Sequence, residues 1–532
     1  MSNTSEAVYL KPNVLAEPLI NQWYAWPYLL SPTTLPFYLA NFHMKILQSF
    51  IAAPQTHVSA LKNPAMIGGP FMNCDPSRVP DVKVLLAKTM NEQAHLLEFA
   101  DSVKRVDSML SNEADGYSME GMYKQVPDNL RGYVELVYDL NNNPSIRFIE
   151  GLLYKSRYHT PTSQSISLSL VHEDGRPFVF STPRLGGDGD LHLKLAFSSQ
   201  QIDELFKMKQ EARPYEQVRE ILGIEGEREE RLFSSFFTSE PPKRCARYDG
   251  DDVRVRYFGH ACILIESGGV SVLTDPLISY DYESDVERYS YSDLPDVIDY
   301  VLITHNHQDH VLFETLLQLR HKIKQIIVPR SCGGTLADPS LKLILQHAGF
   351  RNVTEIDEME SIEIDGGAIT SLPFLGEHAD LNIRTKTAHL VRLQDRAILC
   401  AADSNNIEPK LYEHVHEIAG DIDVVFLGME CVGGPLTWLY GPLLTKPLAR
   451  KNDQSRRFDG SDYAKAIDIV ERLKPKHVYV YAMGHEPWLT FLTSINYTDE
   501  SKQIVESNKL VDACRRMGVT SERLFGRKEI LL

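Results

Sequence analysis

The sequence predicts an α/β fold for the C-terminal half of the chain and an α+β domain before it. From residue 253 onward, short β-rich runs alternate with runs of helical spacing, a pattern typical of an α/β sandwich. Before residue 245, pairs of strand-like runs and separate helical runs follow one another in a mixed order. The hydrophobic fraction of 43% and the charged fraction of 24% are those of an ordinary globular protein. We therefore expect two domains, residues 1–245 and residues 246–532.

The C-terminal domain is expected to contain a series of strands, each a short apolar and β-branched run between turn signals. The predicted strands are Val253–Phe258, Ala261–Ile265, Val270–Thr274, Tyr300–Thr304, Lys324–Pro329, Ala368–Pro373, Thr387–Leu393, Ala397–Ala402, Val424–Gly428 and His477–Tyr481. Helical spacing between them predicts helices at Val311–His321, Leu341–Ala348 and Asp462–Leu473.

The N-terminal domain is expected to combine two hairpins with three helical stretches. One hairpin would join Tyr133–Leu140 to Ser145–Leu153, and the other Ser165–His172 to Pro177–Ser181, because turn-forming residues separate each pair. The predicted helical stretches are Leu35–Ala52, Val84–Met109 and Gln200–Leu222. The polar stretch Glu225–Glu230, followed by Ser239–Pro242, is expected to link the two domains.

Composition argues against several classes of function. The formal net charge of −17 does not suit a protein that grips nucleic-acid phosphates or docks on an anionic membrane. Residues 1–23 lack the basic start and apolar core of a signal peptide. The seven cysteines are scattered and odd in number, so we expect reduced thiols in a cytoplasmic protein rather than a disulfide framework or a cysteine metal site.

The strongest functional signal is a run that directly follows the apolar strand of residues 301–303. Its sequence is Thr304-His305-Asn306-His307-Gln308-Asp309-His310. His305 and His307 share one side of an extended backbone, whereas Asp309 and His310 emerge as a helix begins. Two pairs aimed at adjacent points suit two metal ions about 3.5–4 Å apart. Histidines on a solvated loop are the alternative, and this spacing behind an apolar strand argues against it.

Further candidate ligands stand where other apolar strands end. They are Glu377 and His378, Asp403, and His485. A sheet brings its strand ends to one edge, so these side chains can meet the histidine run there. For each residue alone, a loop position or a helix cap is an equal alternative. Their joint occurrence in this order favours a metal site.

These motifs resemble the metallo-β-lactamase superfamily. The resemblance rests on the run Tyr257–Glu266, the run Leu273–Pro276, the His-x-His-x-Asp-His signature, and the later Asp403 and His485, and it covers residues 250–490. It implies an αβ/βα sandwich with a dinuclear metal site at one edge.

The residue at position 377 departs from most zinc hydrolases of that superfamily, which carry a histidine after the glycine corresponding to Gly376. This chain has Glu377 there, and the adjacent His378 is the alternative ligand. The resemblance then implies one metal on His305, His307 and Glu377, and a second on Asp309, His310 and His485. Asp403 would bridge the two metals. Four histidines and three carboxylates favour redox-active iron more than a histidine-rich zinc set does.

The glutamate, the long N-terminal extension and the opening run Pro18–Leu30 resemble the family of diiron β-hydroxylases that includes that of chloramphenicol biosynthesis. The resemblance implies an O2-dependent monooxygenase with two iron ions and an external electron donor, delivered by a reductase. Its substrate would be an amino acid held as a thioester on the carrier domain of a nonribosomal peptide synthetase and hydroxylated at the β-carbon. Glu377 would act in catalysis, and the N-terminal domain would form a homodimer and dock the carrier domain.

Several other residues are candidates for supporting roles. Asp275 and Glu430 are expected either to orient metal ligands or to form buried caps and turns. The sequence assigns His260 a structural hydrogen bond near the site and His389 a place in the core. Residues 404–406 would cap a helix. Residues 433–435, Trp438, Tyr440 and Trp488 either line a substrate channel or pack in the core.

A zinc hydrolase of the same fold, acting on an ester, lactone or phosphodiester, is the main competing function. Its metals would lower the pKa of a bound water to about 7 and supply hydroxide. Glu377 and the metal content discriminate between the two functions. A binding module that has lost activity is disfavoured by the complete ligand set, and the acidic charge ranks a nuclease lowest.

Overall fold

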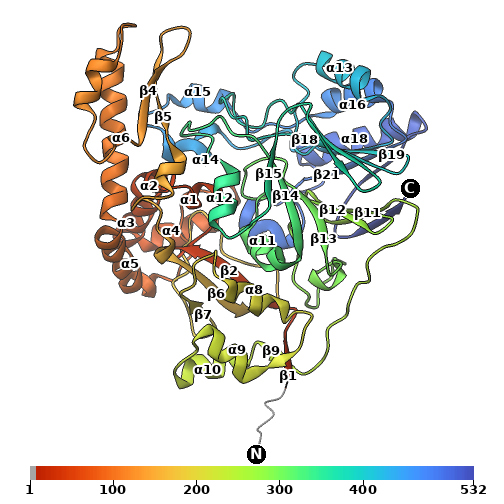
Figure 1. Ribbon diagram of the computed structural model, residues 1–532, viewed down its shortest axis with the longest axis horizontal. Helices are drawn as coiled ribbons and strands as arrows, with labels where there is room; N and C mark the ends of the chain where they lie inside the picture. The colour runs from red at the N-terminus through yellow and green to blue at the C-terminus, as the bar shows by residue number, and fades with distance from the viewer. Residues whose placement is uncertain (1–6) are drawn as a thin grey trace, which may run out of the picture.

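The protein, described here from a computed structural model over residues 7–532, is built around two stacked seven-stranded sheets (Figure 1). Residues 1–6 of the predicted N-terminal domain lie outside the described residues. In spatial order the first sheet contains β15 (Val353–Ile356), β14 (Ile323–Pro329), β13 (Ile298–Leu302), β12 (Val270–Thr274), β11 (Cys262–Ser267), β10 (Arg254–Gly259) and β23 (Lys528–Leu531). The second contains β16 (Ser361–Ile364), β17 (Gly367–Leu372), β18 (Ala388–Leu393), β19 (Arg396–Cys400), β20 (Val424–Gly428), β21 (His477–Tyr481) and β22 (Thr520–Arg523).

Each sheet mixes antiparallel and parallel strands. In the first, Val255 of β10 lies opposite Ile265 of β11, and the parallel run begins where Val272 of β12 pairs with Tyr300 of β13. In the second, β19 to β22 are parallel. Parallel strands carry their carboxyl ends to the same edge, so the segments after β19, β20 and β21 leave the sheet side by side.

Apolar side chains from both sheets fill the space between them. Residues of this inner core include Val255, Ile263, Ile327, Ile369, Val391, Ile398 and Phe426. The outer face of the second sheet is covered by α13 (Lys410–Ala419), α16 (Tyr463–Leu473) and α18 (Lys502–Arg516). On the outer face of the first sheet lie α11 (Phe313–Leu319), α12 (Leu341–His347) and the N-terminal domain. This arrangement confirms the predicted αβ/βα sandwich.

The N-terminal domain combines small sheets with helices. Its strands are β1 (Ala7–Leu10), β2 (Val14–Ile20), β3 (Trp23–Tyr24), β4 (Val134–Tyr138), β5 (Pro144–Phe148), β6 (Gln164–Leu170), β7 (Leu191–Leu193), β8 (Arg213–Pro214) and β9 (Phe237–Thr238). Its helices are α1 (Pro27–Leu30), α2 (Leu35–Tyr38), α3 (Met44–Ala52), α4 (Pro54–Leu61), α5 (Val79–Glu92), α6 (Ala94–Glu113), α7 (Glu150–Leu153), α8 (Gln200–Lys207), α9 (Tyr215–Leu222) and α10 (Glu227–Ser234). The four-stranded sheet has the order β3-β2-β6-β7, and β4 and β5 form the predicted first hairpin.

Four predictions for this domain are wrong in detail. The second hairpin does not form, because β6 pairs with β2 and β7 and residues 177–181 form no strand. The stretch Val84–Met109 is two helices that meet at Gln93. Gln200–Leu222 is also two helices, separated by residues 208–214, and Pro214 directly precedes the second. The predicted linker at 225–230 runs into α10. Residues 239–253, by contrast, contain no helix or strand.

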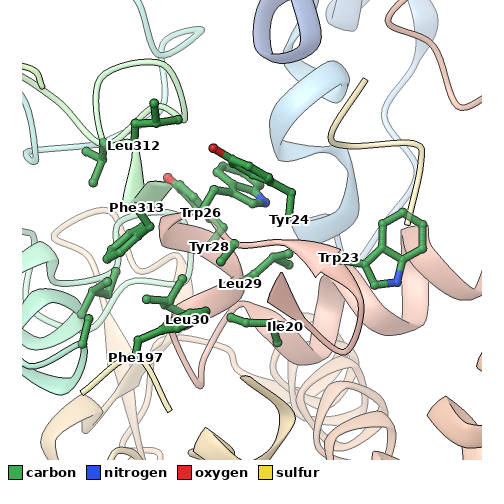
Figure 2. Close-up of a cluster of buried hydrophobic side chains, with 14 of the residues drawn as sticks. Ile20, Trp23, Tyr24, Trp26, Tyr28, Leu29, Leu30, Phe197, Leu312 and Phe313 are labelled. Atoms are coloured by element: carbon green, nitrogen blue, oxygen red, sulfur yellow. The ribbon is translucent and has the colours of Figure 1, made fainter. Parts of the chain in front are cut away.

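The two domains share one hydrophobic core. Figure 2 shows aromatic and apolar residues of the 20–30 segment gathered with Phe197, Leu312 and Phe313 in a buried cluster. Leu312 and Phe313 come shortly after the histidine run, and α11 begins at Phe313. The N-terminal domain therefore packs against the element that carries the candidate ligands.

A buried ionic network also joins the domains. The Arg176 guanidinium lies 2.6 Å from Glu17 and 2.7 Å from Glu314 of α11, and Arg184 contacts Glu17 at 2.7 Å. Tyr24 donates a hydrogen bond to Glu314 at 2.8 Å. Burial raises the pKa of Glu17, but the Arg184 and Arg176 charges outweigh it and bring that pKa to about 2. The Glu17 carboxylate is therefore ionised at neutral pH.

Within residues 7–532, none of the helices has the length and apolar character needed to cross a lipid bilayer.

Candidate metal centre

The histidine run lies in the sharp turn between β13 and α11. The Thr304 carbonyl accepts a hydrogen bond from Thr387 N–H at 2.7 Å, which fixes the start of the turn against the second sheet. The His307 carbonyl accepts from the N–H groups of His310 and Val311, at 3.2 and 3.0 Å, as the chain enters the helix. The turn therefore brings side chains two and three positions apart toward one place.

Three overlapping groups of metal-binding side chains lie at this edge of the sandwich, and within each group the donor atoms lie within 4.8 Å of one another. The groups are His305, His307 and Glu377; His305, His310 and Asp403; and His260, Asp309 and His310. The middle group shares His305 with the first and His310 with the third. The donors therefore form a continuous row with Asp403 at its centre.

Short distances link the donors along this row. His307 Nδ1 lies 3.2 Å from Glu377 Oε1, and His305 Nε2 lies 3.7 Å from Asp403 Oδ2. His310 Nε2 is 3.0 Å from Asp403 Oδ2. At the far end, His260 Nε2 is 3.3 Å from Asp309 Oδ2. Six of the seven predicted ligands are brought together, and Asp403 occupies the central position that a bridging ligand requires.

Some of the donor atoms are left without hydrogen bonds in the part of the protein that the structure describes, as metal ligands would be. His305 Nε2 and Asp403 Oδ1 are buried and have no hydrogen-bond partner among the described residues. Burial, followed by the neighbouring His310 and His307, lowers the pKa of His305 well below its usual range, and burial lowers that of His307 to about 4. Neutral imidazoles, as at His305 and His307, are the ligand state that metal binding needs. At His310 the Asp403 and Asp275 carboxylates outweigh burial and raise the pKa well above its usual range, so metal binding there would displace a proton. Four histidines and three carboxylates in the row suit a pair of iron ions.

His485 is not in the row, although the sequence predicts it as a ligand. Its ring stacks on Phe525 with the centroids 4.9 Å apart, after a turn in which Ala482 and Gly484 both adopt positive φ. His260 takes the corresponding place. It lies in the β10–β11 turn, where Gly259 and His260 both adopt positive φ, and its N–H faces Glu486 at 3.3 Å. The sequence assigns His260 only a structural hydrogen bond. The sequence signal that could have identified His260 as a candidate ligand was its position in a tight turn directly after a strand.

Glu377, rather than His378, completes the first group. Gly376 and Glu377 both have positive φ, and a Cβ added at Gly376 would lie 2.4 Å from Asn405 Cβ. The backbone can therefore make this turn only with glycine before the glutamate. His378 points to a different partner, with Nδ1 2.8 Å from the Tyr440 hydroxyl. Burial, then the nearby Asp403, raises the pKa of Glu377 well above its usual range, which a bound cation would reverse.

Several residues orient the ligands. Asp275 Oδ2 lies 2.8 Å from His310 Nδ1, and Asp275 also accepts hydrogen bonds from Thr304 N–H and Oγ1 at 2.8 and 2.6 Å. The Tyr440 hydroxyl lies 3.1 Å from His307 Nε2. Asn306 donates to the hydroxyl of Tyr28, at 3.2 Å. Tyr28 belongs to α1, so the N-terminal domain reaches the residues next to the ligands.

The other sequence candidates have separate places. His389 is buried, with Nε2 2.9 Å from the Ile303 carbonyl, as a core histidine would be. Asn405 and Asn406 contact residues 459–468 instead of capping α13. Trp488 packs on Gly259, where an added Cβ would lie 2.9 Å from its ring. Trp488 therefore supports the His260 turn rather than lining a channel.

A cavity of about 200 Å³ opens beside the donor row. Its lining includes four donors of the row, His307, Asp309, Glu377 and Asp403. The other lining residues are Ile67, Gly68, Gln308, Glu430, Gly433, Gly434, Trp438, Leu439, Phe458 and residues 493–495. The predicted channel residues Gly433, Gly434 and Trp438 do line it. Trp438 Nε1 donates to the Gly68 carbonyl at 3.1 Å, so the N-terminal domain supplies part of the lining, a contribution that the sequence analysis did not predict.

The sandwich and its row of histidine and carboxylate donors define a metallo-β-lactamase-fold metalloprotein. Residues 271–434 match the β-lactamase superfamily domain, and residues 9–241 match the diiron non-heme β-hydroxylase N-terminal domain. The chain is 38% identical over 532 residues to the 4-amino-L-phenylalanyl-(CmlP-peptidyl-carrier-protein) 3-hydroxylase of Streptomyces venezuelae, covering 98% of this chain and 99% of that enzyme. The chain belongs to the family of diiron non-heme β-hydroxylases.

Solved structures agree with this membership. The crystal structure of CmlA, a diiron β-hydroxylase from Streptomyces venezuelae, superposes with a TM-score of 0.93 at 37% identity, over 99% of this chain and 100% of that one. Similarity to hydrolases is partial. A UPF0173 metal-dependent hydrolase of Lysinibacillus sphaericus is 28% identical over 97 residues, which are 18% of this chain and 40% of that protein.

Replacing Asp275 by asparagine is expected to lower iron affinity by about 10- to 100-fold, because the carboxylate that holds His310 in place is lost. Iron retained per chain against a competing chelator measures the effect. Asp296→Asn is the matched control, since Asp296 is exposed just before β13. Equal iron retention in the two variants would contradict a ligand-orienting role for Asp275.

Proposed function

We propose that the protein is an O2-dependent diiron monooxygenase that hydroxylates the β-carbon of an amino acid tethered as a thioester to a nonribosomal peptide synthetase carrier domain. The observation that carries this proposal is the group of His305, His307 and Glu377, which opens on a cavity partly walled by the N-terminal domain. Full-length similarity to an enzyme whose name specifies a carrier-protein-bound aminoacyl substrate supports the same assignment.

The seven donors of the row would hold two iron ions, with Asp403 shared between them. When bound, the irons would supply O2 activation: the substrate C–H bond, O2, two electrons and two protons yield C–OH and water. A reductase is proposed as the electron source. The protein's own part is to hold the ligands in place through Asp275 and Tyr440, and to keep bulk water out with Trp438, Leu439 and Phe458.

Glu377 is proposed as the ligand that also faces substrate, because it lines the cavity and lies within reach of His307. We further propose a homodimer formed through the N-terminal domain, and a cytoplasmic location. All seven cysteines lie within residues 7–532 and none forms a disulfide, as a reducing compartment would require.

Intact-mass analysis of aminoacyl carrier proteins tests this function. Iron-loaded protein with O2 and an electron donor should add one oxygen atom to one of a panel of aminoacyl carrier proteins, and omission of O2 or of electrons should abolish the gain. Zinc-loaded protein that releases the amino acid without O2 would instead establish a thioester hydrolase and overturn the proposal.

A further inference from the structure

One carboxylate in the cavity is not accounted for by the metal row. Glu430 follows β20 and Asp403 follows β19, so the two parallel strands deliver them to the same edge. The Glu430 carbonyl accepts a hydrogen bond from Gly460 N–H at 2.9 Å, which fixes its backbone. Glu430 lines the cavity together with Asp309, Glu377 and Asp403, but it belongs to none of the three donor groups.

Glu430 also lacks a cationic partner. Within the described part of the chain its side chain meets the Tyr497 hydroxyl but forms no ion pair, and neither lysine nor arginine is among the residues that line the cavity. Burial, followed by the nearby Asp403 and Asp309, raises the pKa of Glu430 well above its usual range, as expected of a carboxyl group that lacks a cation. The nearby acidic Asp459 is already engaged, because it accepts a hydrogen bond from Gly433 N–H at 2.9 Å. A partly buried carboxylate without a counter-charge is costly unless a ligand supplies one.

The proposed substrate carries such a charge at a defined place. In an α-aminoacyl thioester the ammonium group is two bonds from Cβ, the carbon that must meet the metal pair. Trp438, Leu439 and Phe458 offer an apolar wall for the amino-acid side chain, and Ile67 and Gly68 stand on the opposite domain. Glu430 lines the same cavity as the donors Asp309, Glu377 and Asp403, so a substrate whose Cβ meets the metal pair would carry its ammonium group into the space that Glu430 also lines.

We propose that Glu430 binds the α-ammonium group of the tethered amino acid and thereby places Cβ, rather than another carbon, before the metal pair. This inference rests on the proposed function and deepens it, because it names the residue that would distinguish an α-aminoacyl thioester with a free amine from other acyl thioesters. Acyl chains without the amine would bind in several registers. Glu430 is thus a specificity-determining residue and not a metal ligand.

The test compares Glu430→Gln with the wild-type protein on a matched pair of probes. The probes are the aminoacyl carrier protein that gains oxygen in the experiment above and the same carrier protein bearing that acyl group without its amine. Glutamine keeps the shape but loses the charge. For the amine-bearing probe we expect affinity under anaerobic conditions and kcat/KM each to fall about 10- to 100-fold, the loss typical of a charged hydrogen bond. For the probe without the amine, both should change less than about threefold by the same reasoning.

Two controls keep the outcomes separate. Iron content of Glu430→Gln should equal that of the wild type. Glu471→Gln, the same change at an exposed glutamate of α16, should treat both probes as the wild type does. The proposal would be overturned if Glu430→Gln lost iron, or if its affinity and kcat/KM fell equally for both probes. If the wild type oxidises no carrier-bound amino acid at all, the proposed function itself fails, and the inference falls with it.

Discussion

Replacing Asp403 by asparagine is expected to remove most of the bound iron and to lower the rate of hydroxylation by more than about 100-fold. This effect is larger than the roughly 10- to 100-fold loss that follows when a residue that only orients a ligand is replaced. Asp403 stands at the centre of the donor row, with Oδ2 3.0 Å from His310 Nε2 and 3.7 Å from His305 Nε2. Its other oxygen, Oδ1, is buried and has no hydrogen-bond partner within residues 7–532. The group of His305, His310 and Asp403 shares one histidine with each of the other two groups. Loss of the Asp403 carboxylate should therefore remove a ligand from both metal positions.

Iron per chain and intact-mass turnover measure this effect. The matched control is Asp395→Asn, in the β18–β19 turn that precedes Asp403 by one strand, where the carboxylate is 81% exposed. The control should retain wild-type iron and activity. An Asp403→Asn protein that still holds two irons per chain would show that the carboxylate does not bridge the two metal positions.

Replacing Arg176 by alanine is expected to lower the free energy of unfolding by about 3–5 kcal/mol, because the change leaves buried carboxylates without their counter-charge. Arg176 lies between Glu17 of the N-terminal domain and Glu314 of α11, and the side chains of all three are at most 10% exposed. The guanidinium also lies 3.6 Å from the centre of the Phe491 ring. The loss therefore weakens the contact between the domains as well as the core.

Denaturant unfolding followed by tryptophan fluorescence measures the change. Arg147→Ala provides the control, because the Arg147–Glu135 pair is 46% exposed on both sides and should contribute at most about 1 kcal/mol. If the two variants lost similar amounts of stability, the buried network would not be what holds the domains together.

Strand prediction succeeded in the interior of the sheets and failed at their edges. The ten strands predicted between residues 253 and 481 are all present. The four missed strands, β15, β16, β22 and β23, have four residues each and are the edge strands of the two sheets. Interior strands are buried on both faces and read as continuous apolar runs, whereas edge strands such as β16 alternate exposed and half-buried residues and carry a weaker signal.

The sequence by itself determined the sandwich, the clustered histidine run, and the ends of β19 and β20 where Asp403 and Glu430 stand. These features are local, because each depends on an apolar strand and the turn that follows it. Only the tertiary structure decided that His260 and not His485 joins the row, that Glu377 and not His378 faces His307, and that Tyr28, Ile67 and Gly68 reach the site from the other domain. Those choices depend on contacts between segments far apart in the chain, where a turn at positive φ or a neighbouring side chain settles which way each residue points.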